Sequence, residues 1–139
     1  MADRYLKTCP NGKEGRKHDF QAGENFYRAS ASMSRCYEDF FDRAAAQWWD
    51  VYRTHDGPGA KTYFYARHYN SPISSYTQMA WSFTRNLGCS IRECQSSIVV
   101  SCRYNEVGNR IDYPMYNKGP TCSQCQRMTR CNPSTGLCI

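Results

Sequence analysis

The feature that most constrains this chain of 139 residues is its set of nine cysteines, which crowd toward the C-terminal end. Beyond Cys9 and Cys36, they are Cys89, Cys94, Cys102, Cys122, Cys125, Cys131 and Cys138. Such dense use of cysteine is typical of disulfide-bonded proteins from oxidising compartments. A zinc site is the alternative, because Cys122 and Cys125 have the spacing of a ligand pair, although no second pair of that spacing follows. The odd count leaves at least one cysteine without a disulfide partner within the chain.

The composition predicts a folded domain, since 40% of the residues are hydrophobic and 22% are charged. The net charge of +6 is modest and no long basic run occurs, although the C-terminal tail is somewhat basic, so we expect no nucleic-acid partner. No stretch is apolar enough to predict a membrane span. The start of the chain also lacks the apolar region of a signal peptide, which conflicts with the compartment that the cysteines indicate. We therefore expect an incomplete or processed chain.

Apolar spacing predicts two helices. The first runs from Ser34 to about Tyr52, with Trp48 and Trp49 as core anchors and a stripe made of Tyr37, Phe41, Ala44, Trp48 and Val51 or Tyr52. The second runs from about Ser75 to Leu87, opened by a capping box of Ser75 and Gln78 and closed by Gly88. Its expected buried stripe is Tyr76, Met79, Ala80, Phe83 and Leu87.

Strands and loops occupy the rest of the first 116 residues. Residues 10–23 form a polar loop, Phe26-Tyr27 opens a short strand, and residues 60–73 form an aromatic loop with at most a short strand. Residues 91–94 and 98–104 predict a hairpin. If its loop is Gln95-Ser96, Cys94 faces Ser97, and counting outward sets Cys89 opposite Cys102. Facing Cα atoms about 4.5 Å apart are within disulfide range, so this register predicts the Cys89–Cys102 bond.

Residues 117–139 carry four cysteines and almost no large apolar side chains. Such a segment cannot form its own hydrophobic core, so we expect disulfides among Cys122, Cys125, Cys131 and Cys138 to fold it. Four cysteines allow three pairings, and the sequence does not choose among them.

Four motifs in order along the chain resemble those of the CAP superfamily, the cysteine-rich secretory, antigen 5 and pathogenesis-related proteins. Residues 75–84 (SYTQMAWSFT) are similar to the first family signature, and residues 99–104 (VVSCRY) with Gly108-Asn109 to the second. Residues 23–27 (GENFY) resemble the family's Gly-Glu-Asn motif, and Trp48-Trp49 its aromatic pair. The cysteine spacing of residues 122–138 resembles the hinge of nematode activation-associated secreted (venom-allergen-like) proteins.

The resemblance implies an α+β fold, the three-layer α-β-α sandwich of CAP type, N-terminally incomplete because the family's first helix has no counterpart. Residues 1–116 would form the CAP domain and residues 117–139 a cysteine-rich hinge. The resemblance also implies that Cys9 pairs with Cys94 and Cys89 with Cys102, which leaves Cys36 as the odd cysteine.

Many CAP proteins line a central cleft with two His and two Glu that hold a divalent metal. Here Glu24 matches one Glu, but Ser75 stands where the family has His, and Val51 where it has the other Glu. The remaining His falls in the absent N-terminal segment. One carboxylate cannot replace this ligand set, so we expect no metal and no other cofactor. We expect Glu24 to accept backbone N–H bonds in its own loop, and His18, His55 and His68 to be surface residues.

No motif of an enzyme nucleophile or phosphate loop occurs, so the sequence predicts a protein without catalytic residues. The aromatic loop is a candidate binding surface of Tyr63, Phe64, Tyr65, Arg67 and Tyr69, because Tyr and Arg are favoured interface anchors; half-buried packing is the alternative. The resemblance implies a secreted, extracellular binding protein whose partner is an unknown protein or cell surface, host molecules if the nematode likeness holds. The alternatives are sterol or small-lipid binding or export, a truncated product without function, and a metal-dependent hydrolase.

Overall fold

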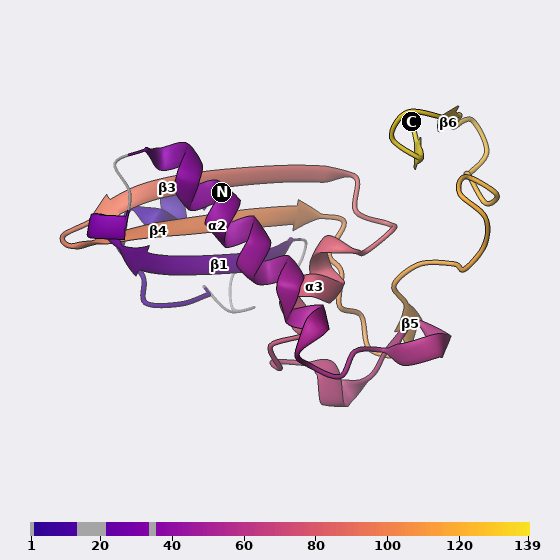
Figure 1. Ribbon diagram of the computed structural model, residues 1–139, viewed down its shortest axis with the longest axis horizontal. Coiled ribbons are helices and arrows are strands. Elements are labelled where there is room, and N and C mark those ends of the chain that lie inside the picture. The colour runs from indigo at the N-terminus through magenta and orange to yellow at the C-terminus, as the bar shows by residue number, and fades with distance from the viewer. Residues whose placement is uncertain (1, 14–21, 34–35) are drawn as a thin grey trace.

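A three-stranded antiparallel sheet forms the middle of the molecule (Figure 1). The computed structural model describes residues 2–13, 22–33 and 36–139. The strands are β1 (Gly23–Ser30), β3 (Asn86–Cys94) and β4 (Ser97–Asn105), and β4 lies between the other two. The short strand predicted at Phe26-Tyr27 is confirmed as part of β1, which begins at Gly23, within the range predicted as a polar loop. Residues 14–21 of that range lie outside the described residues.

The hairpin of β3 and β4 has the register predicted from the sequence. Cys94 faces Ser97 and Cys89 faces Cys102, so the register prediction is confirmed. Gln95 in the connecting turn has a φ of 55°. Because side chains alternate along a strand, β4 sends Val100 and Tyr104 to one face of the sheet and Val99 to the other.

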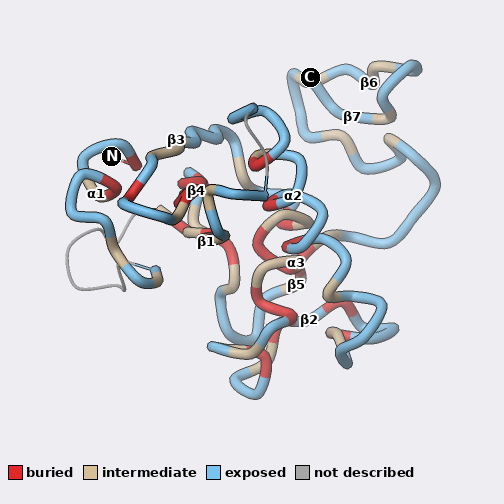
Figure 2. The backbone as a smooth tube through the Cα atoms, turned by 60° about the vertical axis from the view of Figure 1, so that its left-hand side comes forward, coloured by how far each residue is buried: buried red, intermediate tan, exposed pale blue. Residues whose placement is uncertain are grey.

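Helices cover both faces of the sheet (Figure 2). On one face α2 (Tyr37–Asp50) packs its buried side chains against Tyr27, Val100 and Tyr104. On the other face α1 (Ala2–Leu6) packs Leu6 against Val99 and Cys94. The predicted three-layer α-β-α sandwich is therefore confirmed.

Helix α2 begins at Tyr37, and a turn of 3₁₀ helix over Val51–Arg53 continues it. Its buried residues are Phe40, Ala44 and Trp48. At the start of the helix the buried position is therefore Phe40, and not the predicted Tyr37 and Phe41. Trp48 is buried as predicted, and its Nε1 donates to the Phe26 carbonyl at 3.0 Å. Trp49 is 41% exposed, so its assignment to the core is wrong. Ser34 lies outside the described residues.

The second predicted helix is much shorter than expected. Helix α3 spans Ser74–Met79, and Leu87 and Gly88 already belong to β3. The predicted core residues Phe83 and Leu87 are 41% and 61% exposed, whereas Trp81 is buried. The capping box is wrong too, because the N-cap residue is Ile73 and makes no side-chain cap bond.

Tertiary hydrogen bonds explain why α3 ends early. The Ser82 N–H donates to the Met115 carbonyl at 2.8 Å, and the Arg85 N–H donates to the Asn105 carbonyl at 2.7 Å. Backbone donors engaged in this way cannot bond to carbonyls one helical turn earlier. The two strands β2 (Tyr63–Phe64) and β5 (Tyr113–Pro114) pair beside this turn, where Phe64, Trp81 and Met115 form a separate buried cluster.

Two disulfides belong to the sandwich, and they are the pairs expected from the resemblance. Cys9 bonds to Cys94, and Cys89 bonds to Cys102 across the hairpin. Cys36, which precedes α2, is exposed and lies outside the disulfides.

Residues 117–139 form a separate C-terminal segment beyond β5 (Figure 1). It contains one short two-stranded sheet, β6 (Cys131–Asn132) with β7 (Leu137–Cys138). Disulfides join Cys122 to Cys131 and Cys125 to Cys138, one of the three pairings left open by the sequence. A link to the sandwich is the hydrogen bond that Arg85 donates to the Gln126 side-chain carbonyl.

Candidate functional site

Two neighbouring pockets contain the residues expected in the family cleft. The first, here called the Gln78 pocket, has a volume of about 160 Å³ and is lined by Lys13, Glu24, Gln78, Arg103 and Asn109, among others. The second, of about 420 Å³, is lined by Val51 and Ser75. Both are lined in part by Lys13, Asn70 and Ser74. Glu24 thus lies in one pocket, and Val51 and Ser75 lie in the neighbouring one.

Glu24 is held by side chains of the neighbouring strand. It faces Arg103 in the register of β1 and β4. Its Oε1 accepts a hydrogen bond from the Ser101 hydroxyl at 2.9 Å and lies 3.6 Å from Arg103 Nη2. The Glu24 and Arg103 side chains are only 7% and 9% exposed, so their charges are paired where little water screens them. The expectation that Glu24 accepts backbone N–H bonds in its own loop stays a prediction, because part of that loop lies outside the described residues.

Ser75 and Val51 offer little to a metal ion. The Ser75 hydroxyl lies 3.1 Å from the Trp48 carbonyl and 3.0 Å from the Pro72 carbonyl, so its hydrogen is directed to the backbone. Val51 is a hydrocarbon side chain at the start of the 3₁₀ turn. With Glu24 already paired to a guanidinium, these three positions do not fit the divalent metal that the family cleft holds.

The C-terminal cysteines do not suit the zinc site considered as an alternative in the sequence analysis, because they form disulfides. Within the described residues, the sulfur atoms of Cys122, Cys125 and Cys138 lie within 4.8 Å of one another. All three belong to disulfides, whereas zinc binds the thiolate form of cysteine.

Gln78 is among the residues that line the pocket and is only 2% exposed. Its Oε1 accepts a hydrogen bond from the Gly108 N–H at 3.2 Å, and its Nε2 has no hydrogen-bond partner among the described residues. A Cβ atom on Gly23 would lie 1.9 Å from Gln78 Oε1, and one on Gly108 would lie 2.6 Å from Nε2. The glycines of two sequence motifs therefore make room for this amide.

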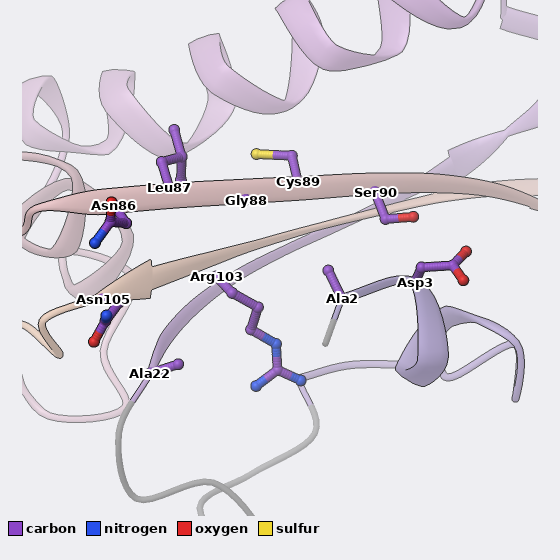
Figure 3. Close-up of a pocket in the computed structure, with 10 residues that line it drawn as sticks. All are labelled: Ala2, Asp3, Ala22, Asn86, Leu87, Gly88, Cys89, Ser90, Arg103 and Asn105. Atoms are coloured by element: carbon purple, nitrogen blue, oxygen red, sulfur yellow. The ribbon is translucent and has the colours of Figure 1, made fainter.

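Arg103 extends on the α1 side of the sheet (Figure 3). Leu87 and Cys89 of β3 project from the opposite face, as alternation requires. The Arg103 guanidinium carbon lies 5.4 Å from the centre of the Tyr5 ring, and Glu24 fixes the other side of the group. A shallow pocket of about 460 Å³ lies beside it, lined by Ala2, Gly88 and Asn105 among others.

Lys13 is another charged residue among those described that line the Gln78 pocket. Although Lys13 is an exposed residue, desolvation lowers the pKa of its ammonium group, and the charge of Glu24 opposes that shift. The sequence analysis did not predict Lys13, Gln78 or Arg103 as site residues. A signal existed for Arg103, because the pairing of β1 with β4 sets it opposite Glu24, but the sequence did not reveal that pairing.

The aromatic loop presents some of its predicted residues and buries others. Tyr63 and Tyr65 stack with ring centroids 6.3 Å apart, and the guanidinium carbon of Arg67 lies 4.8 Å from the centre of the Tyr65 ring. Tyr69 is half-buried. Phe64 is fully buried against Trp81 and Met115, so its place in the predicted binding surface is wrong.

His68 is also buried, at 3% exposure, which corrects its assignment to the surface. The Tyr65 N–H donates to its Nδ1 at 3.0 Å. Desolvation, followed by the nearby charge of Arg67, lowers the pKa of this imidazole. His68 therefore stabilises the conformation of the loop as a buried hydrogen-bond acceptor. His55 is exposed as predicted, and His18 lies outside the described residues.

Strand β5 brings a second aromatic–guanidinium pair beside the loop. Tyr113 pairs with Phe64 in the small sheet, and the guanidinium carbon of Arg110 lies 4.2 Å from the centre of the Tyr113 ring. Because Tyr113 lies opposite Phe64, it points to the other side of the small sheet from Tyr63. We therefore call only Tyr63, Tyr65 and Arg67 the aromatic–arginine surface.

Comparisons with known proteins place this geometry in a family. Residues 1–104 match the model of the CAP, or cysteine-rich secretory protein, family. A similar nematode protein is Ancylostoma secreted protein of Ancylostoma caninum, 32% identical over 119 residues, which are 84% of this chain and 28% of that protein. Cysteine-rich secretory protein 3 of Homo sapiens is 31% identical over 147 residues, which are 99% of this chain and 54% of that protein. The chain thus spans about half or less of the length of these curated relatives.

The solved structure of Na-ASP-1 superposes with a TM-score of 0.86 at 29% identity, covering 99% of this chain and 35% of that one. The match to the family model covers most of the sandwich, including β1, α2 and the hairpin up to Tyr104. The chain belongs to the CAP family, with nematode venom-allergen-like proteins among its relatives.

Proposed function

We propose that this protein is a secreted, extracellular member of the CAP family that acts by binding a protein partner on a cell surface, without catalysis. The aromatic–arginine surface is the observation that carries this proposal. It combines two stacked tyrosines, Tyr63 and Tyr65, with Arg67, whose guanidinium lies over the Tyr65 ring. Tyr and Arg are enriched among residues that dominate binding energy at protein interfaces, because they offer a large contact area and several hydrogen bonds.

The donor set of the family cleft supports a role without metal-dependent hydrolysis. Glu24 is paired to Arg103, the Ser75 hydroxyl faces backbone carbonyls, and Val51 has no ligand atom. These groups leave no set of ligands that would activate a water molecule.

Secretion is supported by the disulfides and by the relatives. Four disulfides link eight of the nine cysteines, which suits an oxidising compartment. Relatives such as Ancylostoma secreted protein carry secretion in their names. In the part of the chain that the structure describes, no helix combines the length and apolar character needed to cross a bilayer.

Flow cytometry tests the proposal with the fluorescently labelled full chain and a panel of cultured mammalian cells. We expect saturable binding that trypsin treatment of the cells removes. The double variant Tyr65→Ala with Arg67→Ala should weaken binding at least about tenfold, the typical loss for removing an interface anchor pair.

The matched control is Tyr52→Ala with Arg53→Ala, which removes another tyrosine–arginine pair, with its guanidinium carbon 5.4 Å from the ring. This control should bind like the unmodified chain. Absence of saturable binding, or equal losses in the two double variants, would count against the proposal. Trypsin-resistant binding that sterol-loaded vesicles compete for would favour the lipid-binding alternative instead.

A further inference from the structure

We infer that His68 is a positioning residue of the aromatic–arginine surface, and that protonation of its Nδ1 atom releases the turn that holds Tyr65 and Arg67. This inference deepens the function proposed above and rests on it, because it assigns a pH-dependent control to the same surface. It is carried by the hydrogen bonds of one 3₁₀ turn, by the burial of the imidazole and by the guanidinium beside it.

The side chain and the backbone of His68 both bond to Tyr65. The Tyr65 N–H donates to Nδ1 at 3.0 Å, and the His68 N–H donates to the Tyr65 carbonyl at 2.9 Å. The His68 carbonyl accepts a further bond from the Ser71 hydroxyl at 2.7 Å. Together these bonds fix the 3₁₀ turn Ala66–His68, in which Tyr65 is the N-cap residue. The position of Tyr65 on the surface therefore depends on the imidazole.

The hydrogen bond from Tyr65 determines the protonation state of the imidazole. An N–H group donates only to a ring nitrogen with a free lone pair, so Nδ1 carries no proton and the proton of the neutral ring lies on Nε2. Nε2 is buried and has no hydrogen-bond partner among the described residues. The centre of the imidazole lies 5.5 Å from that of the Phe64 ring and 5.8 Å from that of the Tyr65 ring. These surroundings suit a neutral imidazole.

Protonation would remove the acceptor and add a charge to a residue that is 3% exposed. The new Nδ1–H would face the Tyr65 N–H, so two donors would meet where one hydrogen bond now exists. Among the described residues, β2 contributes the uncharged Phe64 to the surroundings of the ring, and the turn contributes the Tyr65 ring and the positively charged Arg67. A buried imidazolium beside a guanidinium is unfavourable, so the ring takes up a proton only when the turn opens. Tyr65 and Arg67 then lose their fixed positions.

The direction of the pH dependence follows from the pKa of His68. Desolvation, with a smaller contribution from the charge of Arg67, lowers this pKa from its usual value of 6.5. The folded turn therefore favours the neutral imidazole. Its contribution to stability is complete above about pH 6.5 and is lost as the pH falls from there toward the lowered pKa. We expect the surface to be ordered at neutral pH and released at acidic pH.

NMR spectroscopy of the full, disulfide-intact chain tests the switch without a binding partner. The ring protons of His68 report its titration, and the backbone amide of Tyr65 reports the hydrogen bond to Nδ1. We expect His68 to titrate below about pH 6.5. Over the same pH range, the protection of the Tyr65 amide against hydrogen exchange, corrected for the intrinsic effect of pH, should fall at least about tenfold.

Two histidine variants make the result specific. In His68→Asn the side-chain oxygen replaces Nδ1 as the acceptor and does not titrate, so the Tyr65 amide should stay protected from about pH 7.5 to about pH 5. His55→Asn is the matched control, because His55 is exposed and its Nδ1 lies 2.9 Å from the Thr54 hydroxyl. This control should respond to pH like the unmodified chain. Thermal melting checks that both variants fold, and the titration of the unmodified chain tests the switch even if one of them does not.

Flow cytometry connects the turn to the surface. Binding of the unmodified chain to cells should weaken at least about fivefold between about pH 7.5 and about pH 5, and His68→Asn should bind equally well at both. Binding that does not change with pH, although the NMR data show an open turn, would overturn the inference, because the surface would then not depend on His68.

The inference is also wrong if His68 titrates at or above about pH 6.5, or if the Tyr65 amide keeps its protection while His68 titrates. Equal pH dependence of the folded His68→Asn variant and the unmodified chain would contradict it as well. If the NMR changes occur as expected but no cell binds the chain, the switch is supported and only the function proposed above fails. Failure of the switch and failure of the proposed function are therefore distinguishable.

Discussion

The sandwich and the C-terminal segment differ in where their side chains lie. In the sandwich, residues such as Phe40 and Val100 are almost entirely removed from water. In residues 117–139 no residue is buried, and Met128, Leu137 and Ile139 are 103%, 62% and 70% exposed. One part of the chain is therefore stabilised mainly by apolar burial, and the other by two covalent bonds that close short loops.

The difference teaches that one chain uses disulfides in two ways. In the sandwich, Cys94 and Cys102 are themselves core residues that pack with apolar neighbours. In the C-terminal segment the disulfides take the place of a core. Loops closed by cysteines 9 and 13 residues apart each contribute about 2.5–3 kcal/mol by loop-closure entropy.

The largest expected effect comes from replacing Cys122, Cys125, Cys131 and Cys138 together with serine. Residues 117–139 should lose all measurable protection of their backbone amides, because no buried apolar group remains to order them. The melting temperature of the sandwich should change by less than about 2 °C. Hydrogen exchange followed by mass spectrometry, together with calorimetry, measures both quantities. A large fall in the melting temperature would show that the two regions fold as one unit.

The reciprocal change, Phe40→Ala, removes a core side chain from α2. It should lower the free energy of unfolding of the sandwich by about 3–5 kcal/mol, the usual result of deleting a buried aromatic ring. Urea denaturation measures this loss, and Tyr37→Ala, at an exposed position one turn earlier, should cost less than about 1 kcal/mol. The pairing of the C-terminal cysteines, mapped by mass spectrometry, should remain as in the unmodified chain; scrambled pairs would contradict the independence of the two regions.

A smaller effect should appear at high pH. Burial of Tyr104, partly offset by the hydrogen bond from Asn25, raises its pKa to about 12. Because the raised pKa favours the neutral form in the folded state, its contribution is complete below about pH 10 and is lost between pH 10 and 12. The loss is about 2–3 kcal/mol.

The measurement is the free energy of unfolding at several pH values, compared between the unmodified chain and Tyr104→Phe. The variant cannot ionise at this position, so its stability should fall less steeply above pH 10. Tyr113→Phe, at an exposed position, is the control and should keep the original slope. Identical slopes for Tyr104→Phe and the unmodified chain would show that this hydroxyl is not a buried group of the sandwich.

The parts of the fold predicted correctly are those that depend on local periodicity. Counting outward from a two-residue loop at Gln95-Ser96 sufficed to set Cys89 opposite Cys102, because the length of a hairpin loop fixes the register of its strands. The helix predicted over residues 75–87 was wrong beyond Met79, since its end is determined by hydrogen bonds to Met115 and Asn105, far away in the sequence. Helical spacing of apolar residues contains no information about such partners.

The residues of the candidate site also fall into two groups, those identifiable from local sequence and those that depend on tertiary contacts. Glu24 was identifiable from its motif, and the aromatic loop from its composition. Arg103 and Gln78 became site residues only through strand pairing and the approach of two glycines, and Lys13 lies next to them through the path of a loop. Burial of Phe64 likewise depends on packing against Trp81 and Met115, which are distant in the sequence. The sequence predicted which segments matter, and tertiary contacts decide which side chains face a ligand.

The bond between Cys9 and Cys94 closes a covalent ring of the chain, because these cysteines are 85 residues apart in the sequence. The exposed loop that carries Tyr63 and Tyr65 lies within that ring. A protease that cuts this loop once would open the ring without separating the two pieces, which stay attached through sulfur. The two pieces of such a nicked molecule remain one covalent unit until a reducing agent breaks the Cys9–Cys94 bond.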